Sequence, residues 1–325
     1  MIFHVRRALV GSRTSTKVRK PLGSILEQNN FRHFMDAVEK TDRPRIAIFD
    51  CDGTMIKGDV GEAMLYYQIE HFLFRQSPGE IWTDHPGREL LQQWYLDLLQ
   101  LPPEERKSSP GFEKFAGAIL DWYFGQIEDG KVAKACADIV RLFAGFTISE
   151  ARDIAQASFD FEHHAKISER SLGGRILPLG IRYLAESLEL LRKLQNEKFD
   201  IWVISGSNKW SVEPVFAPLG VPRDRVIGIE MTEEHGILTS REVLPVPIRA
   251  DKIEAFRRRS ELTPLLVASD SRNDLPLLRR ASMLKVRINS RGRSTEEFFR
   301  DVPKDENGSW VNVEKPTVVE DGIPH

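Results

Sequence analysis

Apolar residues along the chain follow two patterns, short unbroken runs that suit buried strands and longer segments with helical spacing. Runs at 45–49, 200–204, 265–268 and 283–288 predict strands, and weaker strand patterns follow at 225–231 and 237–243. Helical spacing covers 24–40, 180–196, 208–219 and 251–260. Because strands and helices alternate, the sequence predicts an α/β fold with a mainly parallel sheet and helices on both faces.

Residues 58–175 differ from the rest of the chain, because they contain long helical patterns and no convincing strand. The expected helices span 59–76, 86–100, 111–127, 131–144 and 148–164, with Pro, Gly and Ser residues between them. We therefore expect an all-α domain inserted after the first core strand. Gly58 and the pair Gly173-Gly174 flank this insert and are candidates for hinges.

The composition is that of an ordinary globular protein. The chain has 325 residues, of which 41% are apolar and 29% charged, so we expect about two domains. The net charge of −2 gives no reason to expect nucleic acid as a partner, and no apolar stretch approaches the roughly 18 residues of a membrane span. Cys51 and Cys136 are too few for a disulfide framework, and we interpret both as reduced thiols of a cytoplasmic protein.

Both ends of the chain are expected to be appendages of the folded part. Residues 1–22 contain several Arg and Lys residues and no acidic residue. A mobile basic arm is the favoured interpretation, and a basic transit peptide is the alternative. Residues 301–325 are polar and irregular, so we expect a loosely attached tail.

The strand at 45–49 ends in two carboxylates, Asp50 and Asp52, which are followed by Gly53 and Thr54. Side chains two residues apart along a strand point to the same side, so both carboxylates can face one cavity. Two carboxylates held close together repel each other, and a positive group must compensate them. A divalent cation with a phosphorylated substrate is the usual solution, so this run indicates an enzyme. A turn with an Asx cap is the structural alternative, but it does not explain two acids after a buried strand.

Polar groups also follow the other predicted core strands. The second core strand ends in Ser205-Gly206-Ser207, and the third is followed by Asp270 and Asp274. Lys252 lies at the start of the helix before the third strand, and Lys209 is a competing candidate. In open α/β sheets, ligands bind beyond the carboxyl ends of the strands, so we expect these groups to share one site.

These four segments, in this order, resemble the four motifs of the haloacid dehalogenase-like hydrolase superfamily. The match covers about residues 44–57 and 175–290, and the helical insert is similar to the cap of the phosphoserine phosphatase-like branch. The resemblance implies a Rossmann-like core with a cap domain. It divides the chain into an arm at 1–22, a core at 23–57 and 176–300, a helical cap at 58–175 and a tail at 301–325.

The resemblance also implies a role for each residue of the motifs. Asp50 is the expected nucleophile that forms an aspartyl-phosphate, in agreement with the ability of carboxylates to accept phosphoryl groups. Asp52 is expected to protonate the leaving oxygen and then to accept a proton from water. The other implied roles are phosphate binding by Ser205, Gly206 and Lys252, Mg²⁺ binding by Asp50, Asp270 and the backbone carbonyl of Asp52, and support of this site by Asp274 and Asn273. A plain N-cap is the alternative role for Asp274.

The identity of the leaving alcohol is expected to depend on the cap. Asp59 stands where the phosphoserine branch has an acid that contacts the substrate amine, but it can equally cap the helix that begins near Val60. Arg75 and Arg88 are candidates for binding a substrate carboxylate. The cap aromatics are expected to be mostly core, although a few could form a cage for a quaternary ammonium group.

We therefore expect a Mg²⁺-dependent phosphatase that acts on a small, phosphoserine-like metabolite. Phosphocholine or phosphoethanolamine as the substrate is one alternative, because residues 180–205 are similar to phosphocholine phosphatases of the family. Phosphotransfer to an acceptor other than water is another. The non-enzymatic alternative is an inactive binding protein on the same fold, and the intact set of acids argues against it.

Overall fold

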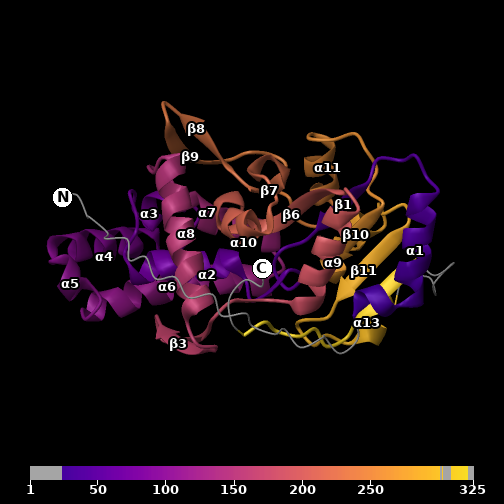
Figure 1. The fold of residues 1–325 in the computed structure, drawn as a ribbon. Helices are drawn as coiled ribbons and strands as arrows, with labels where there is room; N and C mark the ends of the chain where they lie inside the picture. Colours follow the sequence, from indigo (N-terminus) through magenta and orange to yellow (C-terminus); the bar gives the residue numbers. More distant parts are fainter. Residues whose placement is uncertain (1–23, 301, 303–308, 321–325) are drawn as a thin grey trace, which may run out of the picture.

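The computed structural model of the protein describes residues 24–300, 302 and 309–320. Its centre is a sheet of six parallel strands in the order β12-β11-β10-β1-β6-β7, which Figure 1 shows beside a block of helices. The strands are β1 (Ile46–Phe49), β6 (Asp200–Asn208), β7 (Val226–Ile229), β10 (Leu266–Ser269), β11 (Leu284–Ile288) and β12 (Trp310–Val313). The prediction of an α/β fold with a mainly parallel sheet is confirmed.

Alternate residues of β1 face opposite layers of helices. Ala47 and Phe49 belong to a buried cluster shared with α1 (Asn29–Glu39), α9 (Ala185–Asn196) and α10 (Lys209–Phe216). Ile46 and Ile48 belong to a second cluster, shared with α11 (Asp251–Arg257), α12 (Leu275–Leu278) and α13 (Thr295–Phe299). Helices therefore cover both faces of the sheet, which explains why β1 is an unbroken apolar run.

Residues 60–164 form the helical block, whose buried core also includes Trp210 of α10 and Ile229 of β7. Its helices are α2 (Val60–Glu70), α3 (Pro78–Ile81), α4 (Arg88–Gln100), α5 (Pro103–Arg106), α6 (Pro110–Glu128), α7 (Val132–Arg141) and α8 (Ile148–His164). Side chains of Asp59, Ser77, Ser109 and Thr147 accept hydrogen bonds from the first turns of α2, α3, α6 and α8. These N-caps determine where the four helices begin.

The last part of the insert differs from the prediction of helices alone. Residues 168–179 form the antiparallel hairpin β3 (Ser168–Leu172) and β4 (Arg175–Leu179), in which Leu172 and Leu177 are buried. Gly173 and Gly174, with φ of +56° and +75°, make the turn of this hairpin. The polar residues of this hairpin leave too few apolar positions for a strand pattern.

The chain enters the helical block after β2 (Ile56–Lys57) and returns through β5 (Arg182–Tyr183), which pairs antiparallel with β2. Because β5 occupies the start of the helix predicted at 180–196, that helix begins only at Ala185. A second connection is the hairpin of β8 (Met231–Glu234) and β9 (Ile237–Glu242). Leu238 of β9 exchanges backbone hydrogen bonds with Gly145 (2.9 Å) and Phe146 (2.8 Å) of the helical block.

The prediction of an irregular tail at 301–325 is wrong for β12. Trp310–Val313 pair in parallel with β11 at the edge of the sheet, and Val311 and Val313 are buried. This strand has four residues between polar segments, so its pattern is too short to stand out in the sequence. The basic arm at 1–22 lies outside the described residues.

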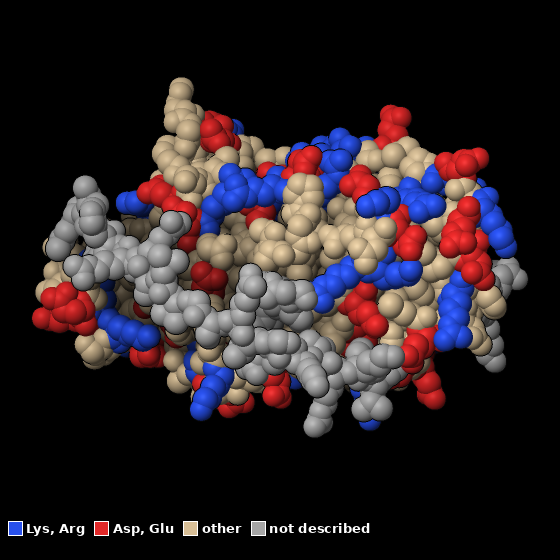
Figure 2. All heavy atoms as spheres, in the orientation of Figure 1, with Lys and Arg blue, Asp and Glu red and all other residues tan. Residues whose placement is uncertain are grey.

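The surface carries both signs of charge. On the face shown in Figure 2, acidic and basic side chains are interspersed over the described part of the surface. In the described residues, no helix is both long enough and apolar enough to cross a bilayer.

Candidate active site

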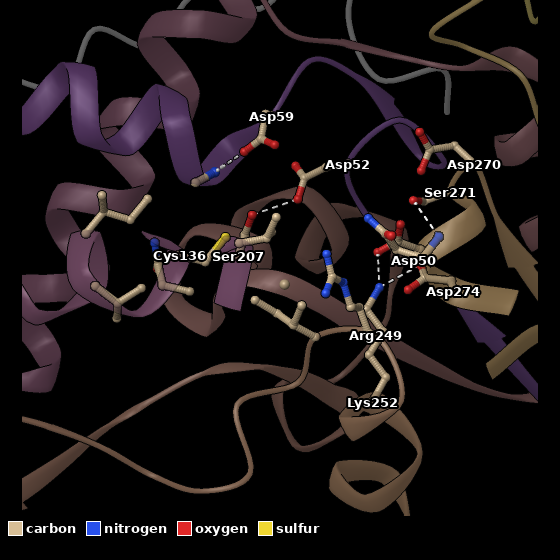
Figure 3. Close-up of a pocket in the computed structure, with 18 of the residues that line it drawn as sticks. Asp50, Asp52, Asp59, Cys136, Ser207, Arg249, Lys252, Asp270, Ser271 and Asp274 are labelled. Carbon is tan, nitrogen blue, oxygen red and sulfur yellow. Dashed lines mark hydrogen bonds and ion pairs between the residues drawn. The ribbon is translucent and has the colours of Figure 1, made fainter. Parts of the chain in front are cut away.

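The carboxyl ends of β1, β6 and β10 lie side by side, because β1 pairs in parallel with both other strands. A cavity of about 130 Å³ lies beyond these ends and is closed on the opposite side by the helical block (Figure 3). Of the nine residues that the sequence predicts for the site, the cavity is lined by all but one: Asp50, Asp52, Asp59, Gly206, Lys252, Asp270, Asn273 and Asp274. Tertiary structure thus brings together motifs that are up to 224 residues apart in the chain, from Asp50 to Asp274.

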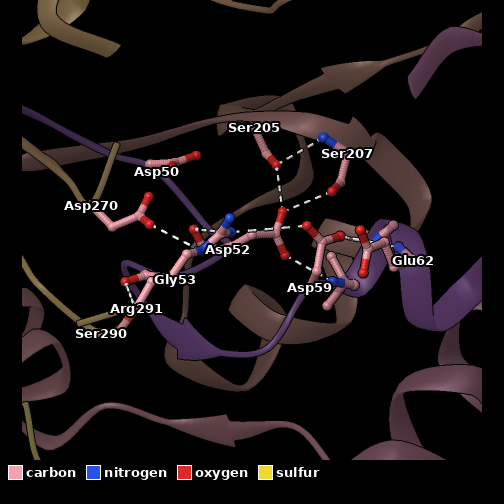
Figure 4. A network of polar contacts seen from close by, with 12 residues as sticks. Asp50, Asp52, Gly53, Asp59, Glu62, Ser205, Ser207, Asp270, Ser290 and Arg291 are labelled. Atoms are coloured by element: carbon pink, nitrogen blue, oxygen red, sulfur yellow. Dashed lines mark hydrogen bonds and ion pairs between the residues drawn. The ribbon is translucent and has the colours of Figure 1, made fainter. Parts of the chain in front are cut away.

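Asp52 accepts hydrogen bonds from three donors (Figure 4). Its Oδ2 accepts from the hydroxyls of Ser207 (2.7 Å) and Ser205 (3.2 Å), and its Oδ1 accepts from the backbone N–H of Val60 (2.8 Å). Burial raises the pKa of Asp52 to about 7 and the charge of Asp59 adds to the shift, while the hydrogen bonds oppose it. A carboxyl group with a pKa near neutrality can both give and take a proton.

Ser205 is the predicted residue that does not line the cavity. It is fully buried behind Asp52, and besides donating to Asp52 its Oγ accepts a hydrogen bond from the backbone N–H of Ser207 (3.0 Å). The side chain of Ser205 therefore holds Asp52, and Gly206 is the residue of this segment whose backbone faces the cavity together with Ser207.

Asp50 lies beside a buried lysine. Lys252 Nζ is 3.0 Å from Asp50 Oδ1 and 2.8 Å from Asp274 Oδ2, and Ser269 Oγ donates to the same Asp274 oxygen (2.7 Å). Burial raises the pKa of Asp50 well above its usual value, and the Lys252 ammonium is the main group that opposes this shift. Although burial opposes it, the carboxylates of Asp274 and Asp50 raise the pKa of Lys252, so the amine stays charged.

The structure decides between the two candidate lysines. Lys209 Nζ lies 3.3 Å from Glu230 and contacts neither carboxylate at the end of β1, whereas Lys252 contacts Asp50 directly. The helix that carries Lys252, α11, packs against β6 and α12, and Lys252 in its first turn lines the cavity. Asn273 also lines the cavity, and its backbone N–H donates to Ser271 Oγ (3.2 Å).

Asp270 approaches the turn after β1 so closely that residue 53 has to be glycine. Gly53 has a φ of +77°, and a Cβ on it would lie 2.5 Å from Asp270 Oδ2. Arg291, in the loop after β11, has its Nε 3.1 Å from Asp270 Oδ2 and donates from Nη2 to the backbone carbonyl of Asp52 (3.4 Å). Asp270 Oδ2 is nevertheless buried without a hydrogen bond from the residues that the structure describes.

These oxygen atoms suit Mg²⁺. In the described part of the chain, no group of three or more His, Cys, Asp and Glu side chains is arranged to hold a metal. Mg²⁺ needs fewer protein ligands than that, because it binds through one or two carboxylates and keeps several waters. Asp50, Asp270 and the carbonyl of Asp52 meet this requirement. The observation that favours a cation here is that Asp270 Oδ2 is buried with no hydrogen bond from a described residue, and that a positive charge, the guanidinium of Arg291, already lies 3.1 Å from it.

A sequence model of haloacid dehalogenase-like hydrolases matches residues 47–279, well over half of the chain. The chain belongs to the haloacid dehalogenase-like hydrolase family. The prediction that the protein is an enzyme of this family is therefore confirmed. No curated protein matches the chain at the level of sequence.

One of the following three solved structures shows the same fold. A conserved protein of unknown function from Anaerococcus prevotii DSM 20548 is similar with a TM-score of 0.71 and 17% identity, over 90% of this chain and 93% of that one. A HAD family hydrolase from Salmonella enterica serovar Typhi has a TM-score of 0.45 and 13% identity, over 91% and 80% of the two chains. A phospho-aspartyl intermediate analogue of phosphoserine phosphatase has a TM-score of 0.38 and 13% identity, over 76% and 87%. The last two are too distant to bear on function.

Asp59 is a helix cap and also lines the cavity of this hydrolase. Its Oδ1 accepts hydrogen bonds from the backbone N–H groups of Gly61 and Glu62 (3.0 Å each), so it is the N-cap of α2. It also lines the cavity, where its Oδ2 is 3.9 Å from Arg291. An N-cap role and a place at the cavity are therefore compatible.

Two further residues were not predicted: Arg291, which lines the cavity, and Glu62, which contacts the lining residue Tyr123. Glu62, in the first turn of α2, accepts hydrogen bonds from the hydroxyls of Tyr66 (3.0 Å) and Tyr123 (3.2 Å). Burial raises the pKa of Glu62 to about 7, and the charge of Asp59 adds to this shift. Arg291 could not be predicted as a site residue from the sequence, because the loop after the last predicted strand contains no recognised motif.

The wall opposite the sheet was also missed. It consists of Tyr123 from α6 and Val132, Cys136, Ile139 and Val140 from the segment of α7. Apolar residues at helical spacing predict a buried face, and the pattern is the same whether that face meets a core or a cavity.

The two arginines proposed to bind a substrate carboxylate are not at the cavity. Arg75 pairs with Glu150 at the surface (2.8 Å), and Arg88 donates to the carbonyl of Thr83 (3.3 Å). Among the described residues that line the cavity, Tyr123 is the one aromatic side chain. The described lining of the cavity therefore contains no aromatic cage.

Proposed function

We propose that this hydrolase is a Mg²⁺-dependent phosphatase that cleaves a small phosphorylated metabolite through an aspartyl-phosphate on Asp50. The observation that carries the proposal is the different surroundings of the two carboxylates at the end of β1. Asp50 lies 3.0 Å from the ammonium of Lys252, which favours a charged nucleophile. Asp52 is held by hydroxyls and has a pKa of about 7, which favours proton transfer.

In the first proposed step, a carboxylate oxygen of Asp50 attacks the phosphorus atom of the substrate. A bond forms between this oxygen and phosphorus while the bond from phosphorus to the ester oxygen breaks. Asp52, in its protonated form, gives its proton to the ester oxygen, and the alcohol leaves. The charge of Lys252 stabilises the negative oxygens of the transferring phosphoryl group, because its ammonium lies at the attacking carboxylate.

In the second proposed step, water attacks the phosphorus atom of the aspartyl-phosphate. Asp52 is now a carboxylate and takes a proton from this water, while the bond between phosphorus and Asp50 breaks. Inorganic phosphate leaves, and both aspartates return to the protonation states in which they began. Ser205 and Ser207 keep Asp52 oriented toward the cavity in both steps, because both hydroxyls donate to the same Oδ2.

Asp50, Asp270 and the backbone carbonyl of Asp52 would hold Mg²⁺ in this proposal. The ion supplies positive charge that keeps Asp50 ionised and attracts the phosphate of the substrate. Asp274 holds Lys252 in place through their 2.8 Å contact, and the backbone of Gly206 and Ser207 faces the phosphate.

The helical block is the proposed cap that selects the leaving alcohol, since α6 and α7 form the cavity wall opposite the sheet. A phosphoserine-like metabolite is favoured over phosphocholine, because the described lining has one aromatic residue and no cage. Water is the proposed acceptor, with Asp52 as the group that takes its proton. We place the enzyme in the cytoplasm, in line with its two free cysteines.

Hydrolysis of p-nitrophenyl phosphate by the Mg²⁺-loaded protein tests this proposal. We expect phosphate release that EDTA abolishes and added Mg²⁺ restores. The variant Asp50→Asn should lose at least about 10³-fold in kcat, because it removes the nucleophile. Asp36→Asn, an exposed position of α1, is the matched control and should keep the wild-type rate.

A direct readout of the intermediate accompanies the rate. After acid quench during turnover, intact mass should show one covalent phosphate on the wild-type protein and none on Asp50→Asn. Normal turnover by Asp50→Asn, or a phosphate that persists on it, contradicts the proposal.

A further inference from the structure

Among the described residues, three cationic side chains line the cavity, and two of them are already paired with acids. Lys252 contacts Asp50, and Arg291 contacts Asp270. The third is Arg249, whose side chain has no hydrogen bond or ion pair with any residue that the structure describes. Its charge is therefore available to a ligand.

The backbone places Arg249 at the cavity. Arg249 lies just before α11 and has a φ of +55°, in the left-handed region that residues other than glycine seldom adopt. Such conformations concentrate at binding sites and active sites. Ile248, beside it, is buried and lines the same cavity, and Lys252 follows on the first turn of α11. Figure 3 shows Arg249 pointing into the cavity from the side of Lys252.

The helical block contributes no competing positive charge to the cavity within the described residues. Its lining side chains are apolar, a thiol, a tyrosine and an acid: Val132, Ile139, Val140, Cys136, Tyr123 and, at the entry to α2, Asp59. Arg75 and Arg88 of the block make surface contacts elsewhere. A negative charge on the leaving alcohol can thus be met by Arg249 without displacing Lys252 from the nucleophile.

We propose that Arg249 binds an anionic group, a carboxylate or a second phosphate, on the leaving alcohol and so makes the enzyme selective for anionic phosphomonoesters. This inference rests on the proposed phosphatase function and names the substrate class of that site. The guanidinium offers a planar pair of donors that matches either anion in a bidentate contact. Asp50, Asp52 and Lys252 perform the chemistry, and Arg249 decides which alcohol reaches them.

Four phosphomonoesters with two-carbon leaving groups test the inference. Ethyl phosphate has a neutral leaving group, phosphoethanolamine a cationic one, phosphoglycolate a carboxylate and ethylene glycol bisphosphate a second phosphate. We expect the wild-type enzyme to have a higher kcat/KM for at least one anionic ester than for ethyl phosphate. The anionic ester with the higher value distinguishes carboxylate from phosphate as the group that Arg249 binds.

The matched variants are Arg249→Asn, Arg249→Lys and Arg241→Gln. Asparagine tolerates the left-handed backbone, and Arg241 is an exposed arginine of β9 outside the cavity. In Arg249→Asn, the ratio of kcat/KM for the anionic ester to kcat/KM for ethyl phosphate should fall about 10- to 100-fold, the effect of one charge-assisted contact. Arg249→Lys keeps the positive charge but not the planar pair of donors, so its ratio should lie between those of wild type and Arg249→Asn. Arg241→Gln should leave the ratio unchanged.

Failure of this inference can be told from failure of the proposed function. If wild-type protein hydrolyses ethyl phosphate and the ratio is equal in wild type and Arg249→Asn, the inference is overturned and the phosphatase stands. If no ester is hydrolysed, titration calorimetry measures the binding of phosphoglycolate and of ethylene glycol bisphosphate to wild type and to Arg249→Asn. Equal affinities of the two proteins for both esters overturn the inference. Arg249→Gly is a further control, because glycine adopts a φ of +55° without strain. If this variant loses selectivity but keeps the wild-type midpoint of thermal unfolding, the loss of selectivity does not come from loss of the fold.

Discussion

Replacing Lys252 by methionine should reduce both the stability and the activity of the enzyme, and a second substitution should separate the two effects. The ammonium of Lys252 lies 3.0 Å from Asp50 and 2.8 Å from Asp274. Methionine has a similar length, so Lys252→Met removes the charge and leaves no large cavity. The two carboxylates then remain buried without their shared cation.

The expected magnitude follows from burial. Lys252, Asp50 and Asp274 are 4%, 6% and 3% exposed, so water does little to screen them. Removing one partner of a buried ionic group costs about 3–5 kcal/mol, and we expect a loss of this size in the free energy of unfolding. The loss in kcat should be about 10²–10³-fold, the usual effect of removing one charge that stabilises a transition state.

Asp274→Asn in the Lys252→Met background removes the second buried charge. We expect the double variant to regain about 1–3 kcal/mol of stability, because one carboxylate no longer repels the other. It should regain no activity, because Asp50 still lacks its cation. Urea unfolding at constant Mg²⁺ and p-nitrophenyl phosphate hydrolysis measure the two quantities. A loss of stability below about 1 kcal/mol in Lys252→Met, or recovery of activity in the double variant, would refute this reasoning.

Two further predictions concern stability. The folded pKa of Glu62 is about 7 against an ordinary value of 4.5, so the folded state holds the proton more tightly and stability falls as pH rises from about 4.5 to 7. Glu62→Gln lacks this titration. From pH 5 to pH 8, the free energy of unfolding of this variant should therefore rise by about 2–3 kcal/mol relative to that of wild type. If the two proteins lose stability in parallel as the pH rises, Glu62 titrates normally and the prediction is wrong. Val311→Ala should lower the free energy of unfolding by about 1–3 kcal/mol, because Val311 is buried in β12. Lys315→Ala, at an exposed position, should leave it almost unchanged. Equal effects of the two substitutions in urea unfolding would show that β12 is not part of the folded sheet.

The core of the site follows from local sequence patterns. A buried run that ends in Asp50 and Asp52 is visible without a structure, because strand geometry alone places both carboxylates on one side. Asp270 and Gly206 follow from the same rule applied to two other strands. Their common location was predictable because the carboxyl ends of parallel strands meet at one edge of the sheet.

Longer-range contacts could not be predicted in this way. Lys252 and Lys209 were both candidates, and the choice depends on the partner that each reaches: Asp50 for Lys252 and Glu230 for Lys209. The sequence predicted a helix at 131–144, but not that the apolar face of α7 forms a wall of the cavity. The strand β12 was missed because its four residues become a strand only by pairing with β11.

The sequence by itself determined the parallel sheet, the helical insert and the carboxylates at the strand ends, because each depends on residues that are near one another in the chain. The tertiary structure decided which groups share a cavity and which are already paired. Arg249 shows the difference. In the sequence it is one arginine among many, and only the fold shows that it lies at the cavity while the neighbouring cations are held by acids. Charge pairing is a property of distance in space, and the order of residues in the chain does not contain it.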